Sequence, residues 1–228
     1  MLENKYRPAS WGELILPKAG KTLMQIACVK QALDKRDYPL RVMIIGESGT
    51  GKTTLARMIA KYAGNLSVMQ EVDGRDVTAG LVKQWREWFT ARNVFGQACV
   101  IVNEAQNFGA ASSGLMTLCD SMKSGILIMT TMNTQKVVFA NAQEDEAITG
   151  RCLTVNITTQ GLAEQAAVRL LEIARLESKD FGDDGKRTLR LLQDHHNNIR
   201  KTLQAIEAGA LCPAGSVANE WAAKVLAA

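Results

Sequence analysis

Short, continuous apolar runs alternate with stretches of helical periodicity over the first 157 residues of the chain. Runs rich in Val, Ile, Leu and Met are typical of strands that are buried on both faces of a parallel sheet. We expect such strands at residues 42–46, 67–72, 98–103, 126–131 and 153–157. The expected helices lie at residues 22–35, 52–63, 78–92 and 112–122. This alternation predicts an α/β fold built on a parallel, doubly wound sheet of five strands.

Residues 160–210 show helical periodicity only. Leu162, Ala166, Leu170 and Ile173 mark one apolar helical face. A Gly-Asp-Asp-Gly sequence at residues 182–185 predicts a loop between two helices. We therefore divide the chain into three parts: an α/β domain at residues 1–158, a helical lid domain at residues 159–210, and a short C-terminal segment at residues 211–228.

Composition excludes several classes of protein. The chain has 228 residues, of which 46% are apolar, and its net charge is +4. No apolar run reaches the roughly 18–20 residues that a membrane span needs, and the N-terminus lacks the apolar region of a signal peptide. We expect a cytoplasmic or nucleoid-associated protein with no membrane partner. The five cysteines form no Cys-x-x-Cys pair, which indicates reduced core residues and no zinc site.

One segment carries the clearest chemistry. Residues 46–53, Gly-Glu-Ser-Gly-Thr-Gly-Lys-Thr, match the phosphate-binding pattern G-x-x-x-x-G-K-[ST] and stand between an expected strand and an expected helix. In such a loop the backbone N–H groups and the helix N-terminus bind phosphate, a lysine contacts the β- and γ-phosphates, and a hydroxyl ligates Mg²⁺. We therefore predict that ATP and Mg²⁺ are cofactors, with Thr53 as a metal ligand. The predicted nucleotide-binding residues of this segment are Gly46, Glu47, Ser48, Gly49, Thr50, Gly51, Lys52, Thr53 and Thr54.

A second apolar run ends in Asn103 and Glu104. Polar residues at the end of a parallel strand emerge beside the phosphates, and a carboxylate there can orient the attacking water. The usual pair is Asp-Glu. Here Asn103 would ligate the metal without adding charge, so activity could be weakened, while Glu104 is the predicted catalytic carboxylate. The alternative is that the pair merely caps a helix.

This order of motifs resembles an AAA+ ATPase, and more narrowly the small subunits of sliding-clamp loaders of the replication factor C type. The resemblance covers about residues 3–210 and includes Lys-Tyr-Arg-Pro at residues 5–8, followed by Trp-Gly-Glu-Leu at residues 11–14. In that family the opening segment packs against adenine. The resemblance therefore implies that Tyr6, Arg7 and Pro8 bind the nucleotide.

The resemblance implies three further site residues. Asn133, with Thr131 as second choice, corresponds to the sensor-1 position at the end of a strand. Arg151, in Gly-Arg-Cys where the family has Ser-Arg-Cys, corresponds to the arginine that reaches a neighbouring subunit's ATP. Arg200, in Asn-Asn-Ile-Arg, corresponds to the sensor-2 arginine. The alternative for Asn133 is that it only ends a strand in a turn, and the alternative for Arg151 and Arg200 is that they are solvated surface arginines.

Two features depart from the clamp-loader pattern. The chain has no room for the family's helical collar domain after the lid, and Lys83, Arg86 and Arg92 form its best basic stripe for DNA. We predict an AAA+ ATPase subunit that works in a ring or spiral with other AAA+ subunits in DNA replication, with a sliding clamp and primed DNA as candidate partners. The alternatives are a helicase loader or other homo-oligomeric remodeller, and an ATP-binding structural subunit that hydrolyses little.

Overall fold

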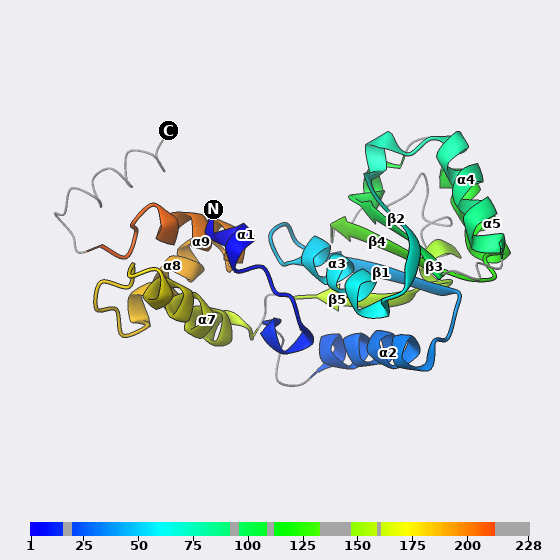
Figure 1. Ribbon diagram of the computed structural model, residues 1–228. Coiled ribbons are helices and arrows are strands. Elements are labelled where there is room, and N and C mark those ends of the chain that lie inside the picture. The colour runs from blue at the N-terminus through cyan, green and yellow to red at the C-terminus, as the bar shows by residue number, and fades with distance from the viewer. Residues whose placement is uncertain (16–19, 92–95, 109–111, 133–146, 159–160, 213–228) are drawn as a thin grey trace. The chain divides into compact units, whose positions relative to one another are not determined.

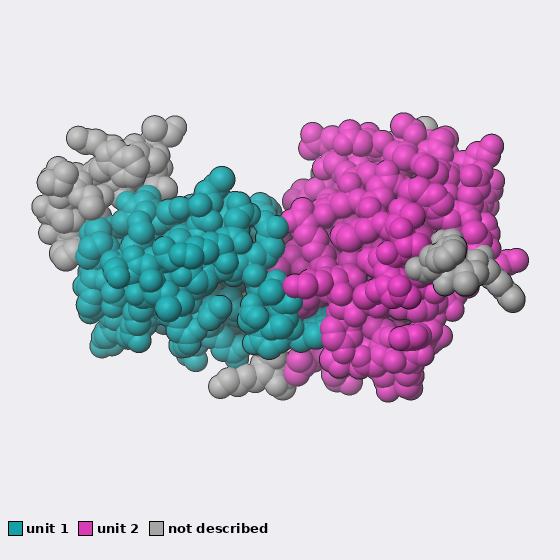
Figure 2. Space-filling view, in the orientation of Figure 1, with its two compact units in different colours: residues 1–17, 48–50, 158–228 teal, residues 18–47, 51–157 magenta. Residues whose placement is uncertain are grey.

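The computed structural model describes residues 1–15, 20–91, 96–108, 112–132, 147–158 and 161–212. The chain divides into two compact units, coloured teal and magenta in Figure 2. The first, which we call the helical unit, comprises residues 1–17, 48–50 and 158–228. The second, which we call the sheet unit, comprises residues 18–47 and 51–157. Within the described residues, no helix has both the length and the apolar character needed to cross a bilayer.

The sheet unit is built on five parallel strands (Figure 1). They are β1 (Leu40–Gly46), β2 (Leu66–Asp73), β3 (Gln97–Asn103), β4 (Ile126–Met132) and β5 (Leu153–Ile157). Their order across the sheet is β2-β3-β4-β1-β5, so the loop after β1 emerges next to the ends of β4 and β5. The predicted α/β class and parallel sheet are confirmed, and each strand begins and ends within two residues of its predicted bounds.

Helices cover both faces of this sheet. They are α2 (Lys21–Lys35), α3 (Lys52–Ala63), α4 (Ala79–Thr90) and α5 (Ser112–Ser121). Trp85 and Phe89 of α4 and Leu115 of α5 are fully buried in a cluster with side chains of β3 and β4. Helix α2 packs on β5, whereas α3 packs on β1, β3 and β4. Burial of apolar side chains on both faces explains why the strands read as continuous apolar runs.

Alternation along the strands decides which face carries their polar ends. Val102 of β3 and Met129 of β4 belong to the cluster under α4 and α5. Because successive side chains of a strand point to opposite faces, Asn103 and Thr130 point to the face on which α3 packs. The polar ends of β3 and β4 therefore lie on the same face as the helix that follows the phosphate-binding loop.

The helical unit has its own apolar core. Its elements are α1 (Leu2–Lys5), the 3-10 helix η1 (Trp11–Glu13), α7 (Ala163–Leu176), α8 (Lys186–Asp194) and α9 (Ile199–Glu207). Leu170, Leu192 and Ile206, one from each long helix, are completely buried together. Leu2 joins this core, and its backbone N–H donates to Glu207 Oε2 at 3.2 Å. The helical residues expected after residue 160 are thus observed. Of the C-terminal segment expected at residues 211–228, the part after residue 212 lies outside the described residues.

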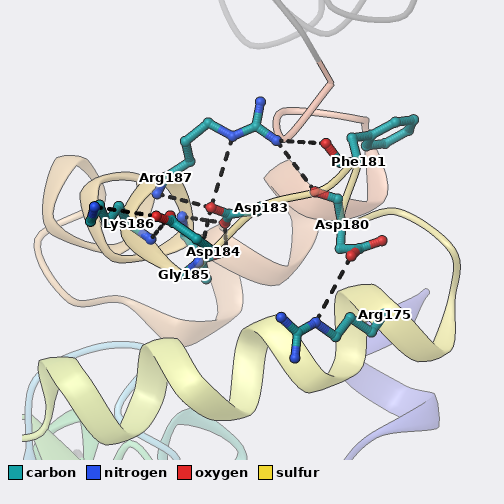
Figure 3. A network of polar contacts seen from close by, with 9 residues as sticks. Arg175, Asp180, Phe181, Asp183, Asp184, Gly185, Lys186 and Arg187 are labelled. Carbon is teal, nitrogen blue, oxygen red and sulfur yellow. Dashed lines mark hydrogen bonds and ion pairs between the residues drawn. The ribbon is translucent and has the colours of Figure 1, made fainter.

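The loop before α8 is organised around the buried carboxylate of Asp183 (Figure 3). Its Oδ1 accepts hydrogen bonds from the backbone N–H groups of Gly185 and Arg187 at 3.0 and 3.2 Å. Its Oδ2 accepts from the N–H and the hydroxyl of Thr188 at 2.8 and 2.5 Å. Burial opposes ionisation, but these hydrogen bonds outweigh it and hold the pKa of Asp183 below its usual value. The carboxylate thereby satisfies the N–H groups of Arg187 and Thr188 in the first turn of α8, while Asp184 Oδ1 accepts from that of Lys186 at 3.0 Å.

Replacing Asp183 with asparagine is expected to lower the free energy of unfolding by about 3 kcal/mol at pH 7. The reason is that an NH₂ group, which can only donate, replaces a carboxylate oxygen that accepts hydrogen bonds from N–H groups. The matched control is Asp184→Asn, since Asp184 lies in the same loop but its side chain is 62% exposed. The folded-state pKa of Asp183 is lowered, so the wild-type advantage is present above about pH 4 and disappears as the pH falls through that lowered pKa. Urea unfolding at several pH values measures both effects. Equal destabilisation by the two variants would contradict the structural role of Asp183.

Candidate nucleotide-binding site

The phosphate-binding loop joins β1 to α3. Gly46 ends β1 between β4 and β5, in register with Met132 and Ile157. Gly51 has a φ of +90°, a left-handed conformation that favours glycine, and α3 begins at the next residue. The N-cap residue of α3, Gly51, has no side chain that could cap the helix. The strand, loop and helix expected around residues 46–53 are therefore present, and a helix N-terminus at this place favours a phosphate.

Lys52 is buried although it carries a charge. Only 5% of the residue is exposed, and its Nζ donates to the carbonyl oxygen of Glu47 at 2.9 Å. A buried ammonium requires hydrogen-bonding partners because desolvation disfavours its charge. The loop's own backbone supplies one of them, which holds the positive charge inside the curve of the loop. A phosphate placed there would find the ammonium already oriented.

Thr53 and Asn103 bring two oxygen atoms together at the start of α3. The Thr53 hydroxyl donates to Asn103 Oδ1 at 3.1 Å, and the Thr130 hydroxyl donates to the same oxygen at 3.2 Å. The other end of the Asn103 amide, Nδ2, donates to Glu71 Oε1 at 2.6 Å. Glu71 also accepts from Nε and Nη2 of Arg57, each at 2.8 Å. The structure thus brings the two predicted metal ligands into contact.

Glu104 occupies a strained turn immediately after β3. Its φ of +52° is left-handed, which is uncommon for a residue with a side chain. The turn fits closely against Gly74, the first residue of the 3-10 helix η2 (Gly74–Asp76), where a Cβ would lie 2.5 Å from the Glu104 carbonyl oxygen. The Glu104 N–H donates to the Thr130 hydroxyl at 3.3 Å. The bend turns the chain out of the sheet at the predicted catalytic carboxylate.

Gln106 connects Glu104 to the end of β4. It lies in the 3-10 helix η3 (Ala105–Asn107), and its Nε2 donates to Glu104 Oε2. Its Oε1 accepts from the Thr131 hydroxyl at 2.9 Å and from the Met132 N–H at 3.3 Å. Thr131, the second choice for the sensor-1 position, therefore reaches Glu104 through Gln106. The first choice, Asn133, lies outside the described residues.

Arg151 is engaged within the sheet unit. Its Nε and Nη2 donate to the two carboxylate oxygens of Asp120 at 2.6 and 3.1 Å, and its Nη1 donates to the Ala147 carbonyl at 2.7 Å. These contacts raise the pKa of Arg151 and lower that of Asp120. Its carbonyl accepts from Arg41 Nε at 3.0 Å. Within one chain, the candidate arginine finger is thus fully paired on a partly exposed surface.

Tyr6, Arg7, Pro8 and Arg200 belong to the helical unit. The Tyr6 hydroxyl donates to Glu177 Oε1 at 2.5 Å, Arg7 donates to Asn4 Oδ1 at 2.7 Å, and Pro8 is half-buried. Arg200 lies 3.5 Å from Glu3 Oε2 and is mostly exposed. Asn198 caps α9, because its Oδ1 accepts from the Lys201 N–H at 3.1 Å. The nucleotide-binding roles of these residues stay predictions.

Four residues of the polar network were not predicted from the sequence: Arg57, Glu71, Gln106 and Thr130. Glu71 and Thr130 stand near the ends of predicted strands, Arg57 lies in the second turn of a predicted helix, and Gln106 follows a predicted strand, but many polar residues share such positions. Glu71 and Arg57 are 14 residues apart, and only the pairing of β2 with β3 brings Glu71 beside Asn103. Among the described residues, no three His, Cys, Asp or Glu side chains form a metal cluster.

Comparison with known proteins identifies a family and a fold. Residues 23–167 match the family described as Novel STAND NTPase 3. No curated protein sequence matches the chain at a significant level. A single-residue variant of RuvB from Thermotoga maritima has a similar structure, with a TM-score of 0.69 and 13% identity over 89% of this chain and 64% of that chain. A Thermotoga maritima RuvB structure titled as a Holliday junction branch migration motor gives a TM-score of 0.66 and 12% identity over the same shares of the two chains.

The chain spans less than two thirds of the length of these RuvB structures. At such low identity the likeness concerns the fold, which is that of an AAA+ P-loop NTPase. The predicted fold class is therefore confirmed.

Proposed function

Since this chain belongs to the Novel STAND NTPase 3 family, we propose that it binds ATP with Mg²⁺ and hydrolyses it. The observation that carries the proposal is the convergence of Thr53 and Asn103 Oδ1, 3.1 Å apart, at the N-terminus of the helix that follows the phosphate-binding loop. Buried Lys52 and the strained Glu104 turn stand in the same unit. A purely structural loop has no need for a buried ammonium.

The residues present fit Mg²⁺. This ion prefers hard oxygen ligands, keeps several waters and takes only one or two ligands from the protein beside the phosphates. Thr53 Oγ1 would bind it directly and Asn103 Oδ1 would bind one of its waters, which agrees with the absence of a dense acidic cluster among the described residues. When bound beside Thr53 and Asn103, the metal would supply positive charge that stabilises the negative charge of the phosphates.

The chain's own residues divide the remaining work. Lys52 binds the β- and γ-phosphates through a charge that the loop already orients. Glu104 accepts a proton from the attacking water and orients it in line with the terminal phosphate. Gln106 holds one oxygen of Glu104, and Thr131 holds Gln106, so the carboxylate has a defined orientation before substrate binds. The sensor-1 role is therefore shared by Thr131 and Gln106 in this proposal, with Asn133 as a further candidate.

Two measurements on the purified full chain test the proposal. A fluorescent ATP analogue should bind in the presence of Mg²⁺, and inorganic phosphate should accumulate from ATP only when Mg²⁺ is present. Binding without phosphate release would favour the structural subunit that hydrolyses little. Failure to bind any nucleoside triphosphate would overturn the proposal.

The wider role we propose is a subunit of a DNA machine, with clamp-loader-like assembly as the first candidate. The resemblance of the opening segment and of Gly-Arg-Cys to the clamp-loader family supports it. In such an assembly Arg151 would exchange Asp120 for the ATP of a neighbouring subunit. Two measurements separate the options. A mixed pentamer in a mass measurement with ATP, together with an ATPase rate that primed DNA and a sliding clamp increase, supports the first candidate. A homohexamer supports a helicase loader or remodeller.

A further inference from the structure

Asn103 stands where P-loop ATPases usually carry an aspartate, and an amide supplies no negative charge to a metal site. We propose that Glu71 provides this missing charge as a positioning residue, acting on the metal through the Asn103 amide. This inference rests on the proposed function, because it concerns the same Mg²⁺ site. It begins from the 2.6 Å hydrogen bond between Asn103 Nδ2 and Glu71 Oε1.

The carboxylate determines which way the Asn103 amide faces. A carboxylate can only accept hydrogen bonds, so it requires the NH₂ end of the amide. Hydroxyls can donate or accept, so Thr53 and Thr130 would tolerate either end. With Nδ2 on Glu71, Oδ1 faces the hydroxyls of Thr53 and Thr130 at 3.1 and 3.2 Å. Glu71 therefore directs the amide oxygen toward the side chain that ligates the metal.

The negative charge of Glu71 is itself held in place. Arg57 Nε and Nη2 each donate to one oxygen of the Glu71 carboxylate at 2.8 Å. Such a bidentate pair fixes the orientation of the carboxylate. Arg57 lies four residues after Thr53 on α3, so the two side chains emerge from the same face of the helix. On the sheet, Glu71 is in register with Ile101, two residues before Asn103, and diagonal neighbours at this spacing can touch through long side chains. Helix and sheet thus position the charge independently.

A hydrogen bond to a charged acceptor polarises the donor amide and increases the negative charge on its oxygen. The site consequently keeps one carboxylate, but it is that of Glu71, which acts through the Asn103 amide, and not that of an aspartate at position 103. Asn103→Asp alone would then place two carboxylates at hydrogen-bonding distance, which is unfavourable for like charges. Moving the charge instead, with Glu71→Gln and Asn103→Asp together, keeps the net charge and lets the new amide donate to the new carboxylate.

The test compares the wild type, both single variants and the double variant. The first measurement is the Mg²⁺ concentration that half-saturates binding of a fluorescent ATP analogue. We expect Glu71→Gln to raise this concentration about tenfold, the lower end of what the loss of an outer metal-site partner causes. We expect the double variant to return to the wild-type value. Glu172→Gln, which also removes a carboxylate paired with an arginine, should leave it unchanged.

The second measurement is the melting temperature without nucleotide and with Mg²⁺ removed by a chelator. Asn103→Asp should lower it, and the double variant should recover it. Unchanged Mg²⁺ dependence in Glu71→Gln, or a loss that the double variant does not rescue, would overturn the inference while leaving ATP binding by the wild type intact. A wild type that binds no ATP in Mg²⁺ would instead overturn the proposed function. An undisturbed melting temperature in Asn103→Asp also contradicts the inference.

Discussion

Replacing Glu104 with glutamine is expected to lower the rate of ATP hydrolysis at least about a hundredfold, while ATP binding stays close to that of the wild type. In the proposed mechanism the carboxylate takes a proton from water, whereas the loop and Lys52 bind the phosphates. An amide oxygen can still accept the hydrogen bond from Gln106, so the turn keeps its shape. Single-turnover hydrolysis and equilibrium binding, measured on the same preparation, separate the two effects.

The control for this variant is Glu87→Gln, an exposed carboxylate on α4 of the same unit. It should hydrolyse ATP at the wild-type rate. If Glu104→Gln keeps more than half of the wild-type activity, water activation belongs to another group. Loss of binding together with hydrolysis would show that Glu104 acts on the fold of the loop and not on the water.

Replacing Lys52 with methionine is expected to weaken ATP binding about a hundredfold, which corresponds to about 2.7 kcal/mol, within the range of a hydrogen bond to a charged group. Lys52 is only 5% exposed and its ammonium is already oriented by the Glu47 carbonyl, so water would screen its interaction with a phosphate only weakly. The apolar replacement fits a buried position, and the protein without nucleotide should melt near the wild-type temperature. The measurement is the rise in melting temperature on adding ATP and Mg²⁺, which should disappear.

Lys61→Met is the matched control, because Lys61 lies on the same helix but is exposed. Its melting temperature should rise with ATP as in the wild type. An ATP response that survives in Lys52→Met would mean that phosphate is held by the backbone of the loop alone. A collapse of the melting temperature without ATP would instead assign Lys52 a structural role.

Local pattern predicted the sheet well because each strand is an uninterrupted apolar run with helices on both sides. The limits of β5 and the start of α3 at Lys52 were predicted to the residue. The end of α4 was less accurate: the helix ends at Thr90 where residue 92 was expected. Apolar periodicity marks the buried turns of a helix but says little about its last, exposed residues.

The chemistry was predictable where it depended on neighbours in the chain. The spacing of Gly46, Gly51, Lys52 and Thr53 is a local pattern, and a strand followed by a helix is enough to interpret it. The same holds for Asn103 and Glu104, which directly follow an apolar run. The meeting of Asn103 with Thr53 follows from the parallel sheet, in which strand ends share one edge.

Residues whose contacts lie on other strands or helices could not be predicted from the sequence. Glu71, Arg57 and Gln106 are polar residues in ordinary positions, and strand order, register and side-chain alternation decide what they touch. The sequence therefore predicted a phosphate-binding loop on a parallel α/β sheet, because both features depend on consecutive residues. Only the tertiary structure shows that Glu71 supplies the negative charge beside Asn103, because Glu71 of β2 and Arg57 of α3 come together only when the sheet is assembled.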